Sequence, residues 1–85
     1  MRIPTQPFKC HFYEFTECRD VYEADARDPA EAAVQACGWW EESGDDYRIL
    51  RGEDTLRVRV EAGTEATFWE VGADRGRYLA KPIRD

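Results

Sequence analysis

The sequence predicts a small α+β domain in which one helix packs on a curved antiparallel sheet. The expected order is β-β-α-β-β-β, with one further strand allowed at the end of this order. Three observations lead to this fold class: several segments alternate apolar and polar residues, one segment carries helix-start signals, and the breaks after it are short. Eighty-five residues leave room for one domain, residues 1–85, in which 1–7 form a leader.

Two extended segments precede the helix. Residues 8–15 place Phe8, Cys10 and Phe12 on one side, alternating with more polar side chains, which is typical of a half-buried strand. Residues 18–26 favour a second strand through Val21 and Tyr22. No Gly or Asn of a tight turn lies between them, so the two segments form either a hairpin or one long bent strand.

The helix is predicted from its first residues. Asp28 can cap it, Pro29 suits the first helical position, and Glu31 lies three residues after the cap. Gly38 is expected either to end the helix or to mark a close approach to the sheet. The predicted packing face consists of small residues at helical spacing, namely Ala30, Ala33, Val34 and Cys37.

Four extended segments follow the helix, at residues 47–51, 55–61, 66–71 and 77–83. The second has the most regular alternation, with apolar residues at 56, 58 and 60 and arginines at 57 and 59. Breaks of two to five residues, including a predicted turn over 72–76, favour antiparallel neighbours in a meander. Pro82 places the last segment at a sheet edge or a strand end.

The charge of the chain is unevenly distributed. The formal net charge is −6, and residues 41–54 hold six acids and two bases, whereas residues 55–85 are slightly basic. An acidic chain argues against nucleic-acid binding, which needs a basic patch to neutralise phosphates. A protein partner with a basic surface suits this charge, and the alternative is that the charge serves solubility alone.

The candidate binding site is the tryptophan pair and the acids that follow it. Successive helical residues diverge by about 100°, so one tryptophan is expected in the core and the other at its rim. Tryptophan is enriched at interface hot spots, and the alternative is that both rings serve the core. The predicted partner-binding residues are Trp39, Trp40, Glu41, Glu42, Asp45, Asp46, Glu53 and Asp54.

No catalytic residue, cofactor or metal site is predicted. His11 is the only histidine, and its neighbour Cys10 would point to the opposite face of a strand. Cys10, His11, Cys18 and Cys37 include the residue types of a zinc site, but their spacing does not match one, so buried thiols are expected. A Cys10–Cys18 bridge stays open for oxidising conditions.

The remaining features are predicted to be structural. Neither a secretory signal nor an apolar run of membrane-spanning length is present, and the odd cysteine count fits a reducing compartment, here the cytoplasm of a bacterial host. Arg57 and Arg59 are expected to form a solvent-facing, salt-bridged basic stripe, which Arg75 and Arg77 could extend. The alternative is that this stripe contacts nucleic acid.

Residues 21–33, V-Y-E-A-D-A-R-D-P-A-E-A-A, resemble a strand-to-helix junction of small phage and prophage proteins. Some anti-CRISPR proteins share this layout, in which a β-α-β-β-β body covers a nucleic-acid or subunit-binding site on a CRISPR effector. The resemblance implies a non-enzymatic inhibitor whose partner is such an effector subunit. The resemblance assigns a functional role to no position of this chain. The alternative is a phage accessory or antitoxin-like module that forms a homodimer through an exposed strand edge.

Overall fold

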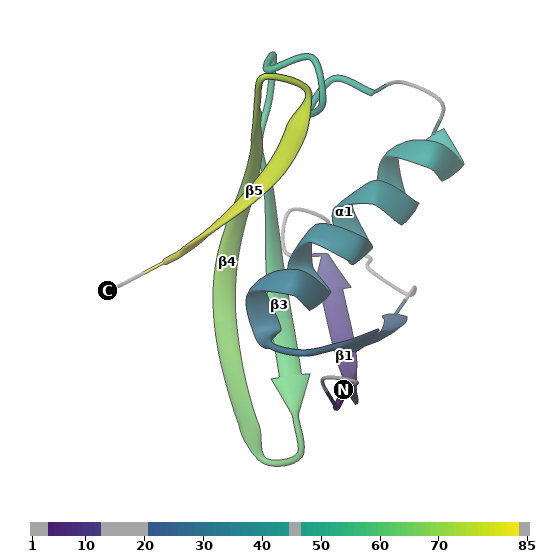
Figure 1. Ribbon diagram of the computed structural model, residues 1–85, viewed down its shortest axis with the longest axis vertical. Coiled ribbons are helices and arrows are strands. Elements are labelled where there is room, and N and C mark those ends of the chain that lie inside the picture. Colours follow the sequence, from purple (N-terminus) through teal and green to yellow (C-terminus); the bar gives the residue numbers. More distant parts are fainter. Residues whose placement is uncertain (1–3, 13–20, 45–46, 84–85) are drawn as a thin grey trace.

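The computed structural model describes residues 4–12, 21–44 and 47–83, with the side chain of Ser43 left aside. One helix lies across one face of a five-stranded antiparallel sheet (Figure 1). The predicted fold class is confirmed. The sheet face that the helix covers is called the inner face below, and the opposite face is called the outer face.

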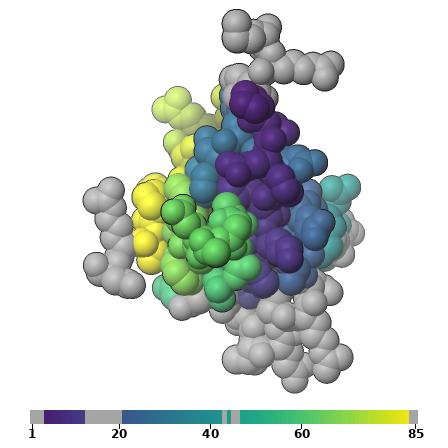
Figure 2. All heavy atoms as spheres, turned by 90° about the horizontal axis from the view of Figure 1, so that it is seen from below, coloured from purple at the N-terminus to yellow at the C-terminus, as the bar shows by residue number. Residues whose placement is uncertain are grey.

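The strands are β1 (Gln6–Phe12), β2 (Val21–Ala26), β3 (Leu56–Ala62), β4 (Glu65–Asp74) and β5 (Arg77–Pro82). Their order in the sheet is β2-β1-β3-β4-β5, so the first strand of the chain lies second from one edge and β5 lies at the other, as Pro82 indicated. Seen from below, β1 (purple) has β2 and the helix start (blue) on one side and the β3–β4 hairpin (green) on the other (Figure 2).

The β1 boundary corrects the predicted leader, because Gln6 and Pro7 already pair with β2. Residues 13–20, over which both predicted N-terminal segments extended, lie outside the described residues.

The meander of β3, β4 and β5 is confirmed. Gly63 joins β3 to β4 with a φ of 62°. Arg75 and Gly76 join β4 to β5 with φ angles of 53° and 77°, the signs of a type I′ turn, whose twist matches that of the flanking strands. This turn is shorter than predicted, because β4 continues to Asp74 and Gly72 therefore lies inside a strand.

Residues 47–51 are not a strand. The Arg51 amide donates to the Tyr47 carbonyl oxygen at 3.0 Å, and the Gly52 amide donates to that of Ile49 at 2.9 Å. Tyr47 has a φ of 43°, which no strand residue adopts. The segment turns so that Ile49 is buried, and of the four extended segments predicted after the helix, three are therefore strands.

Helix α1 (Pro29–Gly44) begins as predicted, since Asp28 Oδ1 accepts a 2.8 Å hydrogen bond from the Glu31 amide. It continues through Gly38, and a Cβ added there would lie 3.8 Å from the Tyr78 ring. Gly38 therefore does not end the helix, and a Cβ there would make only an ordinary van der Waals contact, so no close approach requires the glycine. The inner-face residues differ in part from the predicted ones, because Ala30 and Val34 are only half-buried. The fully buried helical positions are Ala32, Ala33, Ala36 and Cys37.

The core lies between the helix and the inner face. Small helical residues let the backbone of α1 approach the sheet, whose larger side chains fill the space between them. These sheet side chains come chiefly from β1 and β3, and the largest that are fully buried are Phe8, Phe12, Val58, Val60 and Val71.

Candidate functional site

The two predicted anchor tryptophans both pack against Phe12. Trp39 stacks between Phe12, at a ring-centroid distance of 5.8 Å, and Tyr22, at 5.2 Å. Trp40 lies 4.8 Å from the same Phe12 ring. Both tryptophans are half-buried, so the expected division into one core ring and one rim ring is not observed. Each contributes to the packing at the helix, whatever else it contacts.

Glu41 is buried, with 4% of its surface exposed. Its Oε2 accepts a hydrogen bond from the Ile49 amide at 2.9 Å, and its Oε1 accepts from the Leu50 amide at 2.9 Å and the Tyr78 hydroxyl at 2.8 Å. Three donors satisfy the carboxylate, as a buried charge requires. Glu41 therefore ties the helix to the turn after it and to β5, and the prediction that it lies on a partner-binding surface is wrong.

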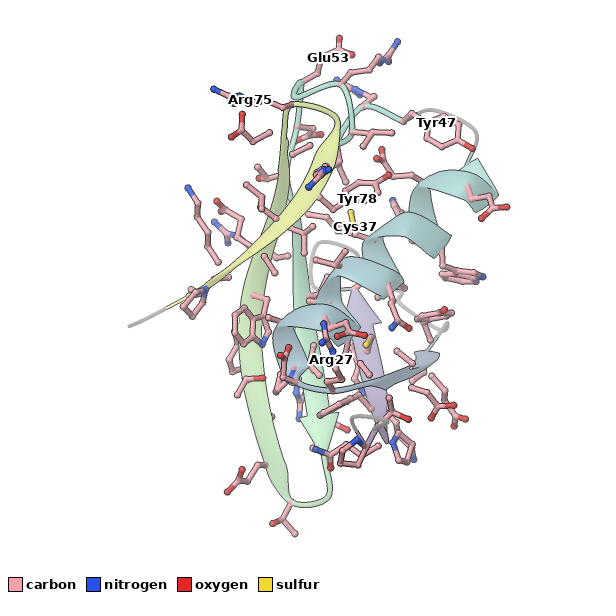
Figure 3. All side chains as sticks on the ribbon, viewed as in Figure 1. Arg27, Cys37, Tyr47, Glu53, Arg75 and Tyr78 are labelled. Carbon is pink, nitrogen blue, oxygen red and sulfur yellow. The ribbon has the colours of Figure 1, made fainter. Side chains whose placement is uncertain are left out.

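Two weak acids, Cys37 and Tyr78, lie close to Glu41 (Figure 3). Burial raises the pKa of Cys37 to about 12, and the charge of Glu41 adds to the effect. Burial and the hydrogen bond to Glu41 raise the pKa of Tyr78 above its ordinary value. Burial likewise raises the pKa of Cys10 to about 11. Both thiols are buried, as predicted, and stay protonated at neutral pH, so neither is an activated nucleophile.

His11 lies on the outer face, away from Cys10. Its Nε2 is 3.3 Å from Glu61 Oε2, and Arg59 Nη2 is 2.6 Å from Glu61 Oε1. The described ranges contain no group of three or more His, Cys, Asp or Glu residues placed to hold a metal ion. Cys18, the remaining residue of the nominal zinc set and of the open Cys10–Cys18 bridge, lies outside these ranges.

The basic stripe divides between strands and a turn. Arg57 and Arg59 lie exposed on the outer face of β3, where Arg59 pairs with Glu61 and Arg57 lies opposite Glu70. Arg75 belongs to the β4–β5 turn, and Arg77 follows on β5 opposite Asp74. Arg57, Arg59 and Arg77 thus each lie beside an acidic residue, either on a neighbouring strand or on the same strand.

The structure divides the predicted acidic patch among several elements. Glu42 is exposed on the helix, and Asp45 and Asp46 lie outside the described residues. Glu53 pairs with Arg51, whose Nε lies 2.7 Å from Glu53 Oε2. Asp54 is exposed, and its Oδ1 accepts a hydrogen bond from the Thr55 amide at 2.8 Å. Of these acids, Asp54 lines a cavity.

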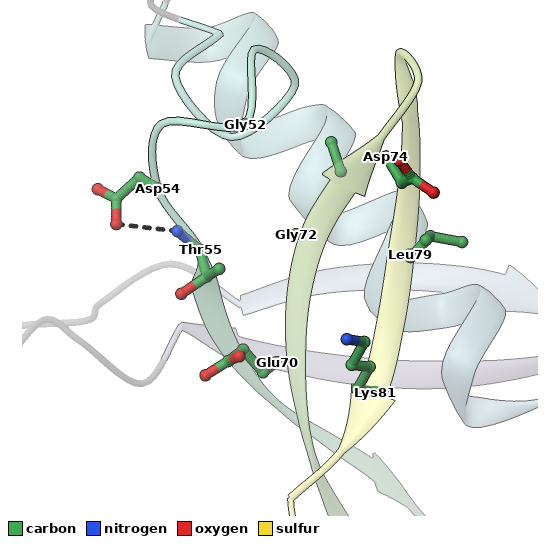
Figure 4. A pocket seen from close by; sticks show the side chains of 9 residues that line it. Gly52, Asp54, Thr55, Glu70, Gly72, Asp74, Leu79 and Lys81 are labelled. Atoms are coloured by element: carbon green, nitrogen blue, oxygen red, sulfur yellow. Dashed lines mark hydrogen bonds between the residues drawn. The ribbon is translucent and has the colours of Figure 1, made fainter.

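That cavity is a groove of about 360 Å³ on the outer face (Figure 4). Val71 points into the core, so its neighbours along β4, Glu70 and Gly72, face outward. Gly72 has no side chain to fill the space between Thr55 and Leu79, which produces the hollow. The lining residues are Gly52, Asp54, Thr55, Glu70, Gly72, Ala73, Asp74, Leu79 and Lys81.

The groove has three carboxylates and one ammonium group. Asp54 and Asp74 lie on opposite sides of one end, and Glu70 and Lys81 lie on opposite sides of the other (Figure 4). Sequence reasoning included only Asp54, because the other groups come from β4 and β5, remote from residues 41–54. The available signal was Gly72, since a glycine inside a strand often marks a place where another group approaches the backbone.

Apolar side chains lie exposed beside the groove. Leu79 is 46% exposed, Phe68 39% and Ile83 38%. The Ile83 amide donates to the Phe68 carbonyl oxygen at 2.9 Å, so these two residues lie opposite each other. The described part of the chain contains no element packed on the outer face, because its single helix contacts the inner one. The β4–β5 half of the outer face therefore combines apolar surface with an acid-lined groove.

Comparison with protein-family models, curated proteins and solved structures gives no significant match to this chain. Among the residues described, the helix is too short and too polar to cross a membrane.

Proposed function

We propose that this chain is a non-enzymatic binding module that holds a protein partner on the β4–β5 half of its outer face. The observation that supports the proposal is the exposure of Phe68, Leu79 and Ile83 on a sheet face that no described element covers. The strand register places the charged pair Glu70 and Lys81 between Leu79 and the pair formed by Phe68 and Ile83. Apolar anchors with polar groups around them are typical of protein interaction sites.

The charge pattern indicates a partner with a basic surface. The groove beside Leu79 carries three carboxylates against one ammonium group, and the whole chain has a formal charge of −6. Complementary charge speeds association and favours one partner over others. Added salt should therefore slow association, because screening weakens attraction between exposed charges.

The proposed mode of action is steric occlusion inside a bacterial cell. A basic protein surface that reads nucleic acid is a natural target for a small acidic domain, because the domain competes with phosphates for the same side chains. The resemblance of residues 21–33 to anti-CRISPR layouts supports a CRISPR effector subunit as that target. The chain would block the subunit without chemistry of its own.

The test compares proteins captured from a bacterial host lysate by wild type and by two variants. Phe68→Ser combined with Leu79→Ser removes apolar surface at the proposed interface. Val21→Ser is the matched control, since Val21 is 44% exposed on β2 at the opposite edge of the sheet. We expect one captured protein that the control retains and the double variant loses. Equal capture by all three proteins would contradict the proposal.

A second candidate function is self-association through a strand edge. Among the described residues the sheet is open, and β2 and β5 are its two edge strands, which can present backbone groups to another chain. Light scattering distinguishes this function, because a symmetric dimer in the absence of any captured protein would favour it. A monomer that still captures a partner would favour the binding module.

A further inference from the structure

We infer that the groove at Gly72 holds an arginine side chain of the partner protein. The inference rests on the proposed function and names the chemical group that the acid-lined part of the surface receives.

The shape of the groove suits a long side chain. Its floor is the backbone at Gly72, with Thr55 on one side and Leu79 on the other. About 360 Å³ is near the lower end of volumes that hold small organic groups. An aliphatic stem can lie along the Leu79 side chain and the Thr55 methyl group while its charged end reaches the carboxylates.

The positions of the carboxylates favour an organic cation over a metal ion. Asp54, Glu70 and Asp74 surround the groove, yet they do not form a group that could share one metal ion among the described residues. A guanidinium is planar and carries five N–H donors, so it can contact carboxylates that are too far apart to meet at a point. It also donates paired hydrogen bonds to a carboxylate, which a lysine ammonium does not match.

Lys81 is the internal competitor for this site. It lies opposite Glu70 in the β4–β5 register and lines the same groove. Its ammonium and Arg57 both lie opposite Glu70, and Arg77 lies opposite Asp74, so an incoming guanidinium is directed toward the end of the groove where Asp54 lies (Figure 4). Removal of the Lys81 charge should therefore strengthen binding of an arginine, whereas removal of the two aspartate charges should weaken it.

The test is a titration of ¹⁵N-labelled full-length chain with acetyl-Ala-Arg-Ala-amide, followed by amide chemical shifts. The control peptide contains citrulline, which has nearly the shape of arginine without the charge. We expect the arginine peptide alone to shift the amides of Thr55, Gly72 and Leu79. The Asp54→Asn and Asp74→Asn double variant should raise the dissociation constant about tenfold, and Lys81→Met should lower it severalfold.

Two substitutions on β4 test the shape of the site. Gly72→Val fills the floor, and Ala66→Val adds the same side chain to an exposed outer-face position near the other end of the strand. We expect the first to abolish the peptide shifts and the second to leave them unchanged. Circular dichroism checks that both variants fold, and if Gly72→Val does not, Gly72→Ala takes its place with a smaller loss.

Several outcomes would overturn the inference. Equal shifts with the citrulline peptide would remove the role of charge, and peptide shifts away from the groove or unaffected by Gly72→Val would remove the site. Equally tight binding of free argininamide would indicate a small-molecule ligand rather than a protein side chain. If the peptide fails while the Phe68 and Leu79 double variant still loses its captured protein, the inference fails and the proposed function stands. If the peptide binds but that double variant captures as wild type does, the proposed function fails instead.

Discussion

The inner and outer faces of the sheet are built from the same strands but differ in how strictly they are determined. On β3, Leu56, Val58 and Val60 are at most 2% exposed, while Arg57 and Arg59 between them are exposed. Burial restricts the inner positions to apolar side chains of suitable size. The outer positions are free of that restriction, so substitutions there are expected to change stability less than substitutions on the inner face.

The largest expected contrast is between two phenylalanines. Phe12→Ala removes a fully buried ring that packs on both Trp39 and Trp40, and should cost about 3–5 kcal/mol of unfolding free energy. Phe68→Ala on the outer face should cost less than about 1 kcal/mol. Urea denaturation monitored by circular dichroism measures both. Similar losses would mean that the outer face is part of the core.

Two adjacent glutamates provide the second contrast. Glu41→Gln replaces a carboxylate oxygen that accepts a backbone hydrogen bond with an amide group that can only donate. It should cost about 1–3 kcal/mol, because a buried donor loses its acceptor. Glu42→Gln changes the same atoms on an exposed side chain and should stay within about 0.5 kcal/mol. The same denaturation experiment decides, and equal effects would remove the structural role of Glu41.

The third prediction is that stability depends on pH through groups buried on the inner face. The Cys37 pKa rises from 9.0 in the unfolded chain to about 12 in the folded one, so above pH 9 the folded state binds more protons. Stability is therefore complete below pH 9 and falls as the pH rises toward 12. Cys37 alone should contribute a loss of about 1 kcal/mol between pH 7 and 10.

Cys10 and Tyr78 contribute to the same fall, because their pKa values are also raised. Cys37→Ala should therefore make the decline shallower without abolishing it, as measured by denaturation at each pH. An unchanged slope would mean that the Cys37 thiol titrates as readily in the folded protein as in the unfolded chain.

The smallest effect is expected at the outer-face glycine. A Cβ at Gly72 would lie 3.4 Å from Thr55 Cγ2, an ordinary contact, and its φ is not in the left-handed region. Gly72→Ala should therefore leave stability unchanged or raise it by less than about 1 kcal/mol, through the lower entropy of the unfolded chain. Thermal unfolding measures the sign. A clear loss would mean that Gly72 is required by the fold rather than kept for the groove.

The inner face could largely be predicted from the sequence, and the site could not. Alternation revealed the buried side of β1 and β3, and Asp28 and Pro29 revealed the helix start, because these signals act between neighbouring residues. The prediction that Glu41 lies on a surface was wrong because the three donors that make its burial possible come from a turn and a distant strand. The groove was missed for the same reason, since Asp54, Glu70 and Lys81 meet only through the strand register.

The central place of β1 has a consequence for how the chain folds during synthesis. Cys10 of β1 pairs with Val60 of β3, fifty residues later, whereas β3, β4 and β5 pair through tight turns. On the ribosome, β1 can pair early with β2, but its other edge stays without a partner until β3 emerges. Such a long-range pairing closes a large loop and is intrinsically slow. The nascent N-terminal half thus exposes an unpaired edge and the apolar side of Phe8 and Phe12, which is where aggregation would begin.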